Sequence, residues 1–406
     1  MKAIITGGSS LRNNLGDQAM ILTLIEYLKA NRPDIEPVAM DENAWNDRDF
    51  TAGFDFRILP DIPMVIKLRE INRFLHILLK LARPGRKFSA ETEDAIIREY
   101  RECDVIFQVA GFGISSQMPF LNCLSRIWDI ALARKLKKKL IMLPQSFGPF
   151  DYKGLKKIIF GYYIRKYINY PEFVLCREEY GKKLLDGIGC TKARLEHDIV
   201  LSRPADLDSK KIYKDGAKTI PKKPDIDRGR DLLVVPNFRL VKYRSIEEVC
   251  DIFEKAIKTF TAHTGGKAYI FRHTFEDEEI ARLIYNRFDK NERVVLCGYE
   301  YDCIETESLF SQFSVGLVSR WHANVHAIRA GLPYVIIGWA EKYRETAGIF
   351  NNADVVFDIR EPLAAKSIGD ALIRVYNKRW ITAERINSKE DEIKKTFCLG
   401  RVLNDI

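Results

Sequence analysis

Residues 315–337 read VGLVSRWHANVHAIRAGLPYVII, a pattern typical of one βαβ unit. The apolar run at 315–319 predicts a buried strand, and a helix begins near His322. Gly331 and Pro333 end that helix before a second apolar run at 334–337. Consecutive strands joined by a helix run parallel, and helices cover the faces of such a sheet. The stretch therefore predicts an α/β fold.

The same alternation extends through most of the chain, in two series. The first series predicts strands at 3–6, 37–40, 105–109, 140–143 and 173–176, with helical patterns between them. The second predicts strands at 232–236, 268–272, 293–297, 315–319 and 334–337. Between the series, residues 206–230 are polar and rich in Lys and Asp, which favours an exposed linker.

This organisation predicts two Rossmann-like domains with a central cleft at the carboxyl ends of their strands. We expect an N-terminal domain over 1–205, a linker or excursion over 206–230, a C-terminal domain over 231–380 and a closing C-terminal helix over 381–406. A length of 406 residues agrees with two hydrophobic cores.

Composition excludes several classes of protein. No apolar run approaches the roughly 20 residues that a transmembrane helix needs, and no signal-peptide pattern follows Met1. We therefore expect a cytoplasmic protein. The net charge is +9, but the cations are dispersed and no nucleic-acid-binding motif accompanies them. An anionic small substrate, or an acceptor near an anionic membrane, fits this charge better than nucleic acid. The eight cysteines lack CxxC spacing, which favours buried, reduced thiols.

One segment raises the question of membrane contact directly. Residues 64–83, MVIKLREINRFLHILLKLAR, are basic and amphipathic over the length of one helix. A role at a membrane surface is one interpretation. The pattern favours the other, a surface helix whose apolar face packs on the sheet.

The first loop with candidate site residues, at 6–19, reads TGGSSLRNNLGDQA and follows a predicted strand. Its glycines let the chain turn sharply, and N–H groups at the start of the next helix can hold an anion. Asn14, Gly16 and Asp17 are therefore candidate site residues. As the alternative, Asp17 caps the helix.

Two further loops follow strands of the first series. AGFGISS, at 110–116, offers the flexible backbone of Gly111 and Gly113, and PQSFGPF, at 144–150, presents the polar groups of Gln145 and Ser146. Ligands of open α/β sheets collect at this edge. A plain structural turn is an equal alternative for each loop.

The strongest local signal is the corner at Ser319, Arg320 and His322, where a predicted strand meets a helix. A guanidinium binds carboxylate or phosphate in a bidentate manner, and an imidazole can bind phosphate or move a proton. His322 and His326 also have the i, i+4 spacing of two zinc ligands. No third ligand follows in sequence and no HExxH is present, so we predict no metal site, and we expect His326 to be satisfied locally.

Other polar residues are candidates for the same cleft. Asn237 and Arg239 follow the first strand of the second series, and a solvated surface arginine is the alternative for Arg239. His197 lies near the domain boundary, where a surface loop is the alternative.

Taken together, the loops resemble those of the polysaccharide pyruvyl transferase family. The motifs that carry this resemblance, in chain order, are LGDQA at 15–19, AGFG at 110–113, QSFGP at 145–149, RE at 177–178, NFR at 237–239, and SRWH at 319–322 followed by AGLP at 330–333. AGFG stands where GGG is more usual, and SRWH lacks the spacer before its arginine. The resemblance covers about residues 5–350.

The resemblance implies a fold of the GT-B glycosyltransferase type. It also implies transfer of pyruvate from phosphoenolpyruvate onto two sugar hydroxyls, which forms a cyclic ketal in cell-surface or exopolysaccharide biosynthesis. Neither a metal nor an organic cofactor is implied. We expect Arg320, Arg239 and His322 to hold the donor, with His322 contacting phosphate or transferring a proton, and Asp17 to orient the acceptor.

The expected acceptor is a sugar, an oligosaccharide or a lipid-linked saccharide, at the inner face of the cell membrane in the last case. A homo-oligomer is compatible with the sequence. One alternative function is a GT-B glycosyltransferase that uses a nucleotide sugar, with Glu341 or Glu345 as the candidates for holding a ribose. The other is a non-catalytic binding homologue.

Overall fold

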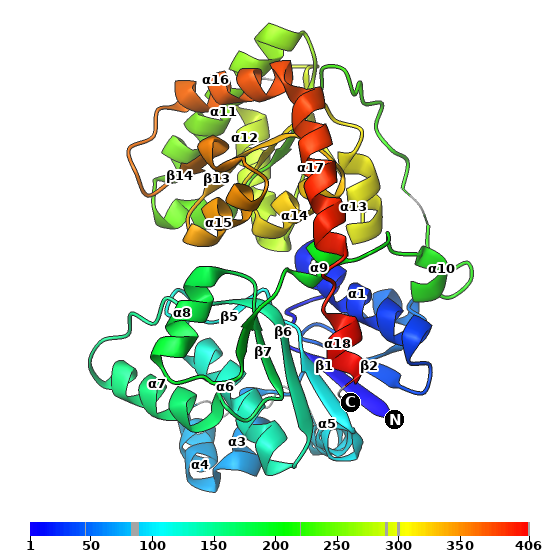
Figure 1. The fold of residues 1–406 in the computed structure, drawn as a ribbon, viewed down its shortest axis with the longest axis vertical. Coiled ribbons are helices and arrows are strands. Elements are labelled where there is room, and N and C mark those ends of the chain that lie inside the picture. The colour runs from blue at the N-terminus through cyan, green and yellow to red at the C-terminus, as the bar shows by residue number, and fades with distance from the viewer. Residues whose placement is uncertain (45, 83–88, 220, 289–290, 299–300, 405–406) are drawn as a thin grey trace.

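The computed structural model describes residues 1–44, 46–82, 89–219, 221–288, 291–298 and 301–404. It contains two parallel sheets, one above the other in Figure 1. The first sheet has the order β3-β2-β1-β4-β6-β7-β8, with β5 beside β6, and the second has the order β11-β10-β9-β12-β13-β14. The strands of the first sheet are β1 (Lys2–Thr6), β2 (Glu36–Asp41), β3 (Arg57–Pro60), β4 (Val105–Gln108), β5 (Phe112–Ile114), β6 (Lys139–Phe147), β7 (Phe173–Cys176) and β8 (Ala193–Leu195). Those of the second are β9 (Leu232–Val235), β10 (Ala268–Ile270), β11 (Val294–Leu296), β12 (Val315–Val318), β13 (Tyr334–Gly338) and β14 (Val356–Asp358).

Helices cover both faces of each sheet, which is why the central strand β9 (LLVV) is wholly apolar and β4 (VIFQ) has its one polar residue at its end. Around the first sheet they are α1 (Leu15–Asn31), α2 (Arg48–Ala52), α3 (Met64–Ile71), α4 (Arg73–Ala82), α5 (Ala90–Glu102), α6 (Phe120–Lys135), α7 (Gly154–Tyr167) and α8 (Glu179–Gly187). The connection holds α9 (Ile199–Ser202) and α10 (Ser209–Ile212). Around the second sheet they are η1 (Phe238–Lys242), α11 (Ile246–Thr264), η2 (Phe275–Asp277), α12 (Glu278–Asn286), α13 (Cys303–Phe310), α14 (Trp321–Arg329), α15 (Glu341–Ile349), η3 (Ala353–Val355) and α16 (Ala365–Asn377).

The end of the chain returns to the first sheet. Helix α17 (Arg379–Lys394) runs from the second sheet toward the first, and α18 (Leu399–Asn404) lies beside α1 and β2 (Figure 1). The rings of Phe397 and Tyr27 are 5.2 Å apart, and Arg32 donates to the carbonyl of Leu403 at 3.2 Å. The stretch predicted as one closing helix over 381–406 is therefore two helices, because the chain turns after Lys394 to reach the first sheet.

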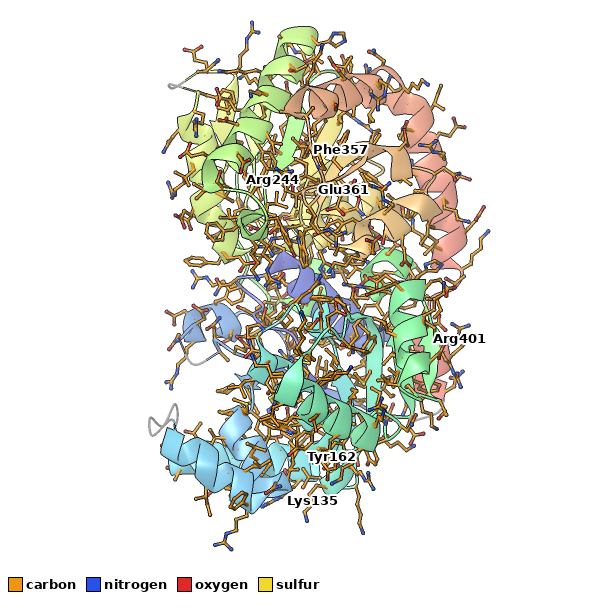
Figure 2. All side chains as sticks on the ribbon, turned by 90° about the vertical axis from the view of Figure 1, so that its left-hand side faces the viewer. Lys135, Tyr162, Arg244, Phe357, Glu361 and Arg401 are labelled. Atoms are coloured by element: carbon orange, nitrogen blue, oxygen red, sulfur yellow. The ribbon has the colours of Figure 1, made fainter. Side chains whose placement is uncertain are left out.

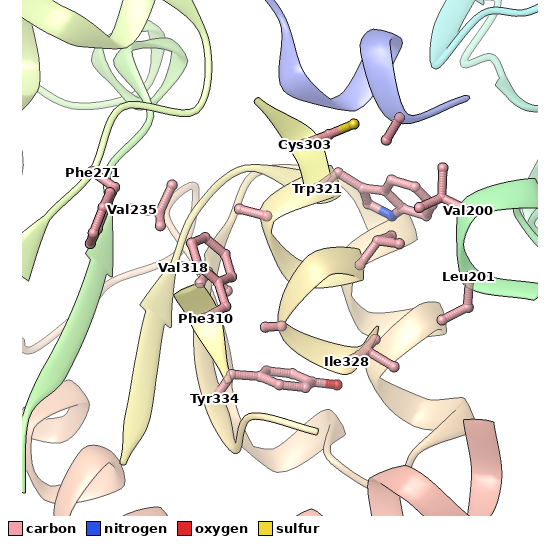
Figure 3. Packing of buried hydrophobic residues seen from close by; sticks show 14 of the residues in the cluster. Val200, Leu201, Val235, Phe271, Cys303, Phe310, Val318, Trp321, Ile328 and Tyr334 are labelled. Atoms are coloured by element: carbon pink, nitrogen blue, oxygen red, sulfur yellow. The ribbon is translucent and has the colours of Figure 1, made fainter. Parts of the chain in front are cut away.

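A single apolar core joins the two halves of the molecule. Val200 and Leu201 of α9 belong to the same buried cluster as Trp321 and Ile328 of α14, and Figure 3 shows these side chains facing one another across the boundary. Burying one large apolar side chain stabilises the folded state by about 1.5–3 kcal/mol. The buried side chains at this boundary therefore hold the strand ends of the two sheets together.

The segment at 64–83 is not one helix. Asn72 is extended, with φ −153° and ψ 98°, and separates α3 from α4. Ile66 and Leu68 are buried, so the packing interpretation is confirmed for α3. Over the described residues no helix has the length and apolar character needed to cross a membrane. All eight cysteines are free and buried, as predicted.

Candidate active site

The order of the strands in each sheet indicates where a ligand site lies. In each sheet the order reverses next to the first strand of the domain, between β1 and β4 and between β9 and β12. Loops after these strands diverge to opposite faces and leave a crevice at the carboxyl edge. A cleft of about 570 Å³ lies there, lined by both halves of the chain. Its wall includes eight predicted residues: Asn14, Asp17, Gly111, Gly113, Asn237, Arg239, Arg320 and His322.

His322 crosses the boundary between the two halves. His322 lies in the first turn of α14, and its ring lies against Gly16. A Cβ atom on residue 16 would collide with Nδ1 of His322. A Cβ on Gly111 would stand 3.3 Å from Cε1, tighter than an ordinary contact. Glycine is therefore required at position 16 by this ring.

The imidazole of His322 is held neutral. Burial lowers its pKa well below the usual value, and the nearby charge of Arg177 acts in the same direction. Nε2 lies 3.9 Å from Oδ2 of Asp198 and has no hydrogen-bond partner among the described residues. A buried ring nitrogen without a hydrogen bond is available to accept a proton.

Arg320 and Arg239 lie together. Arg320 donates to both oxygens of buried Asp277, from Nε at 2.7 Å and from Nη2 at 2.5 Å. Arg320 also donates to Glu276, which accepts from Nε of Arg239 at 2.9 Å. Asn237 fixes the backbone at Arg239, because the side-chain oxygen of Asn237 accepts a hydrogen bond from the backbone N–H of Arg239 at 2.9 Å. The partly exposed carboxylate of Glu276 thus bridges the guanidinium groups of Arg239 and Arg320 at the surface of the cleft.

Lys342 is a third cation in this part of the cleft. Its Nζ lies 4.5 Å from the ring centre of Phe112 and 5.5 Å from that of Trp339, with Trp321 at 6.0 Å. No ion pair or hydrogen bond of Lys342 is found in the described part of the chain. Burial lowers its pKa to about 7, helped by the charge of Arg177. Near neutral pH this ammonium group can therefore give up a proton.

Arg177 forms the floor of the cleft. It donates from Nη1 to Asp198 at 2.9 Å, from Nη2 to the carbonyl of Gly111 at 2.5 Å and from Nε to Ser146 at 2.9 Å. Its guanidinium also stacks 3.5 Å from the ring centre of Trp321. One buried side chain thus connects the glycine loop, the strand end at Ser146 and the first turn of α14.

Replacing Arg177 with methionine is expected to lower the free energy of unfolding by about 3–5 kcal/mol, because Asp198 would be left buried without its partner. Urea unfolding followed by tryptophan fluorescence measures this change. The control is Lys182→Met, which removes an exposed pair with Asp186 at 2.7 Å and should leave the unfolding midpoint almost unchanged. Equal unfolding midpoints for the two variants would contradict the structural role of Arg177.

Asp17 faces the cleft from the first turn of α1. Oδ2 accepts from the N–H of Ser9 at 2.8 Å and from its hydroxyl at 2.5 Å, and burial raises the pKa of the carboxyl group. The helix cap is Asn14, whose side chain accepts from the N–H groups of Gly16 and Asp17. The capping alternative for Asp17 is therefore wrong, because the cap lies three residues earlier.

Five predicted site residues do not line the cleft, and one of them, Gly16, is covered by the ring of His322. Gln145 and Ser146 are buried beneath it, where Ser146 donates to Glu178 at 2.6 Å. The carbonyl of buried Ser319 accepts from Asn237 at 2.9 Å, so Ser319 supports the wall. His197 faces a separate depression on the molecule.

The wall from the first sheet is polar and carries both signs of charge. Lys67 of α3 pairs with Asp129 at 2.5 Å, and Arg126 of α6 lies 4.0 Å from Asp61. Carboxylate and guanidinium groups set side by side are suited to hydroxyl-rich ligands, because they accept and donate hydrogen bonds across one surface.

Two cations of this site, Lys342 and Arg177, were not among the site residues predicted from the sequence. Lys342 follows the end of β13 by four residues, the same signal that identified Arg320 after β12. His326, in contrast, lies as predicted on the buried face of α14, with Nδ1 2.9 Å from Oε1 of Glu307. Among the described residues, no group of three His, Cys, Asp or Glu side chains is placed to hold a metal ion.

The architecture is that of the GT-B class, two Rossmann-like domains whose strand ends face a shared cleft. Similar solved structures include a putative UDP-N-acetylglucosamine 2-epimerase from Listeria monocytogenes, with 10% identity over 99% of this chain and 94% of that chain and a TM-score of 0.59. The Neisseria meningitidis UDP-GlcNAc 2-epimerase bound to UDP-GlcNAc has 12% identity over 100% of each chain and a TM-score of 0.57. Anabaena HepE, in complex with UDP and glucose, has 9% identity over 100% of this chain and 99% of that chain and a TM-score of 0.56.

At such identities these likenesses concern the fold alone. No curated protein sequence matches the chain significantly. The model of the polysaccharide pyruvyl transferase family, however, matches residues 14–341, which include every cleft residue described above except Lys342 and the loop before Asn14. The chain belongs to the polysaccharide pyruvyl transferase family, a family of transferases.

Proposed function

We propose that the protein transfers pyruvate from phosphoenolpyruvate to two hydroxyls of a sugar and so forms a cyclic ketal. The observation that carries this proposal is the cluster of Arg239, Arg320 and Lys342 beside a neutral His322 at one end of the cleft. Phosphoenolpyruvate carries a carboxylate and a phosphate on adjacent groups, and paired cations recognise both. Glu276, which the two arginines share, is partly exposed and can be displaced by such a ligand.

The two lowered pKa values suggest how the proton transfers are divided. Lys342, with a pKa of about 7, keeps its proton in part at neutral pH, whereas His322 is neutral. When the environments of two neighbouring groups push their pKa values apart, one group can serve as the acid and the other as the base. We assign Lys342 as the acid that protonates the methylene carbon of phosphoenolpyruvate and His322 as the base that takes the proton of the attacking hydroxyl.

The steps balance without a redox partner. Protonation of the methylene carbon leaves a cationic carbon that bears the phosphate, and the first sugar hydroxyl forms a C–O bond there. The bond to the phosphate oxygen then breaks, and the second hydroxyl forms the other C–O bond of the ketal. His322 passes the proton of the first hydroxyl to the departing phosphate, and the proton of the second hydroxyl restores the ammonium of Lys342. The arginines stabilise the charge of the departing phosphate, and the proposed chemistry requires neither a metal nor an organic cofactor.

We place the acceptor against the wall from the first sheet. Asp17, Asp61 and Arg126 line this wall, opposite the arginine pair. Their mixed charges suit a hydroxyl-rich sugar, as part of an oligosaccharide or a lipid-linked saccharide. This arrangement brings the diol of the acceptor and the reacting carbon of the donor to the same part of the cleft, near His322.

The alternative, a nucleotide-sugar glycosyltransferase, receives less support from the site. Glu341 pairs with Arg360 at 3.0 Å, and Glu345 accepts from the N–H of Glu179 at 3.0 Å. Both glutamates line the separate depression that His197 faces. Neither carboxylate is thus placed to hold a ribose in the cleft between the arginines and Asp17.

Phosphoenolpyruvate is expected to raise the melting temperature, because a ligand at 100 times its Kd stabilises the native state by about 2.7 kcal/mol. Arg239→Gln should lose most of this shift. This variant is preferable to Arg320→Ala, which would leave Asp277 buried and unpaired. The measurement is differential scanning fluorimetry with phosphoenolpyruvate, UDP-sugars and GDP-sugars.

The matched control is Arg244→Gln. Arg244 lies five residues further along the chain and donates to the carbonyls of Ile359 and Glu361, and it is not among the residues that line the cleft. Figure 2 labels Arg244 near Glu361. This variant should keep the full shift. A shift with a nucleotide sugar alone would favour the glycosyltransferase, and no shift with any of these ligands would leave a binding homologue as the better description.

A further inference from the structure

Helix α7 presents an unusual surface to solvent. Leu155, Ile158 and Tyr162 follow one another at spacings of three and four residues, so they lie on one face of the helix. They are 70%, 69% and 57% exposed, although the opposite face packs normally through Phe160 and Ile164. Three large apolar side chains on one exposed helical face require an explanation other than the core of the chain.

The same helix is strongly basic. Its 14 residues include Lys156, Lys157, Arg165 and Lys166 and no Asp or Glu. The end of α6 and the turn after it, residues 134–139, read RKLKKK and add five more cations. Arg134 donates to the carbonyl of Lys166 at 3.2 Å, so the two basic segments are adjacent. Figure 2 shows Tyr162 and Lys135 at the same end of the molecule.

We infer that the face formed by α7 and residues 134–139, the α7 face, binds the surface of a lipid bilayer that contains anionic lipids. A helix with apolar side chains between cations lies in the plane of the interface, with the apolar groups in the headgroup boundary and the cations against the phosphates. Tyrosine suits this position, because its ring is apolar and its hydroxyl is polar. The hydroxyl of Tyr162 accepts from Nζ of Lys166 at 3.0 Å, so its polar end already faces a cation.

Charge argues against a second copy of this chain as the occupant. A two-fold contact through the α7 face would oppose the cations of one copy with those of the other, and like charges brought together cost free energy. An anionic bilayer instead pairs each cation with a phosphate. Within the segment at 64–83, helix α3 takes no part in such a contact, since Ile66 and Leu68 are buried, whereas Phe74 of α4 is 69% exposed.

The α7 face adjoins the wall that we assign to the acceptor. Nζ of Lys156 lies 5.9 Å from the ring centre of Phe120 in the first turn of α6, and Asn122 and Arg126 of α6 line the cleft. With the proposed function, this neighbourhood favours a lipid-linked acceptor. Membrane binding itself does not depend on that function, because it needs no substrate and no turnover.

Co-sedimentation of the full chain with vesicles tests the inference. We expect binding to phosphatidylcholine vesicles that contain phosphatidylglycerol, little binding to pure phosphatidylcholine, and weaker binding at high salt. Leu155→Ser with Ile158→Ser, and separately Lys156→Glu with Lys157→Glu, should each weaken binding by about tenfold or more.

Two controls match these variants in exposure and charge. Ile381→Ser removes an aliphatic side chain that is 71% exposed on α17. Lys222→Glu with Lys223→Glu makes the same change in net charge in the connection between the domains. Both should bind as the unchanged protein does.

Absence of vesicle binding by the unchanged protein would overturn the inference. So would a loss of binding in the control variants as large as that in the α7 variants, or binding to neutral vesicles as strong as that to anionic ones. A dimer in sedimentation velocity that disappears in the Leu155→Ser, Ile158→Ser variant, without vesicle binding, would assign the α7 face to self-association instead.

Discussion

Lys342→Met is expected to lower kcat/KM for phosphoenolpyruvate by about 10²–10⁴-fold, the contribution typical of a positioned general acid. Methionine keeps an unbranched side chain among Phe112, Trp321 and Trp339 but removes the ammonium group. Release of phosphate in a coupled assay with a sugar acceptor measures this loss.

The pH dependence separates proton transfer from charge alone. Because Lys342 must carry its proton, kcat/KM should fall as the pH rises through about 7. Lys342→Arg keeps the positive charge but cannot release a proton near neutrality. It should therefore retain binding of phosphoenolpyruvate in the melting assay and still lose turnover. Turnover by Lys342→Arg close to that of the unchanged protein would reduce Lys342 to a binding role.

The stability of the Lys342→Met variant provides the folding control. The pKa of Lys342 falls from 10.5 in the unfolded chain to about 7 in the folded one, so the unfolded state binds more protons between these values. Stability of the unchanged protein should therefore rise with pH across that window, and the cost of the buried charge is complete below about pH 7. Methionine removes this cost, so the variant should unfold at equal or higher urea concentration, with the largest difference below pH 7.

His322→Gln is expected to reduce kcat by a similar factor of about 10²–10⁴, because glutamine cannot accept the proton of the attacking hydroxyl. Its effect on the melting shift with phosphoenolpyruvate should be small, since the neutral imidazole contributes little charge to the donor site. Stopped assays of ketal formation and fluorimetry measure the two quantities. A lost melting shift with unchanged kcat would instead make His322 a contact of the donor phosphate.

His326→Gln is the matched control, one turn further along the same helix. His326 is fully buried and bonded to Glu307, away from the cleft. Its replacement should lower the urea midpoint while leaving kcat near that of the unchanged protein. The contrast between two histidines on one helix separates a reactive position from a packing position.

Much of the fold follows from local pattern. The apolar runs at 105–109, 140–143, 173–176 and 315–319 became β4, β6, β7 and β12 within a few residues at each end. A strand buried on both faces needs an unbroken apolar run, and that requirement is visible in a short window of sequence. Strands at the edges, such as β3 with its half-exposed residues, lack this signal and were missed.

The ends of these strands also located the cleft. Polar residues directly after a buried strand are delivered to one edge of the sheet, so Asp17, Arg239, Arg320 and His322 could be predicted to meet. The break at Asn72 could not, since the amphipathic pattern continues through it and α3 turns to pack on α6.

What local pattern established is therefore the α/β alternation and the set of loops that face the cleft, because both depend on residues close together in the chain. The ionisation of the site depends on contacts between distant segments. Glu341-Lys342-Tyr343 has the sequence of a solvated helix start, and only the approach of Phe112 from the other domain, together with Trp339 and Trp321, removes water from the ammonium group and lowers its pKa. Gly16 likewise sets the position of His322 from the opposite wall, and burial between the two walls, helped by the charge of Arg177, lowers its pKa and keeps it neutral. Desolvation and Coulomb energy follow distance in space, which the folded chain alone sets.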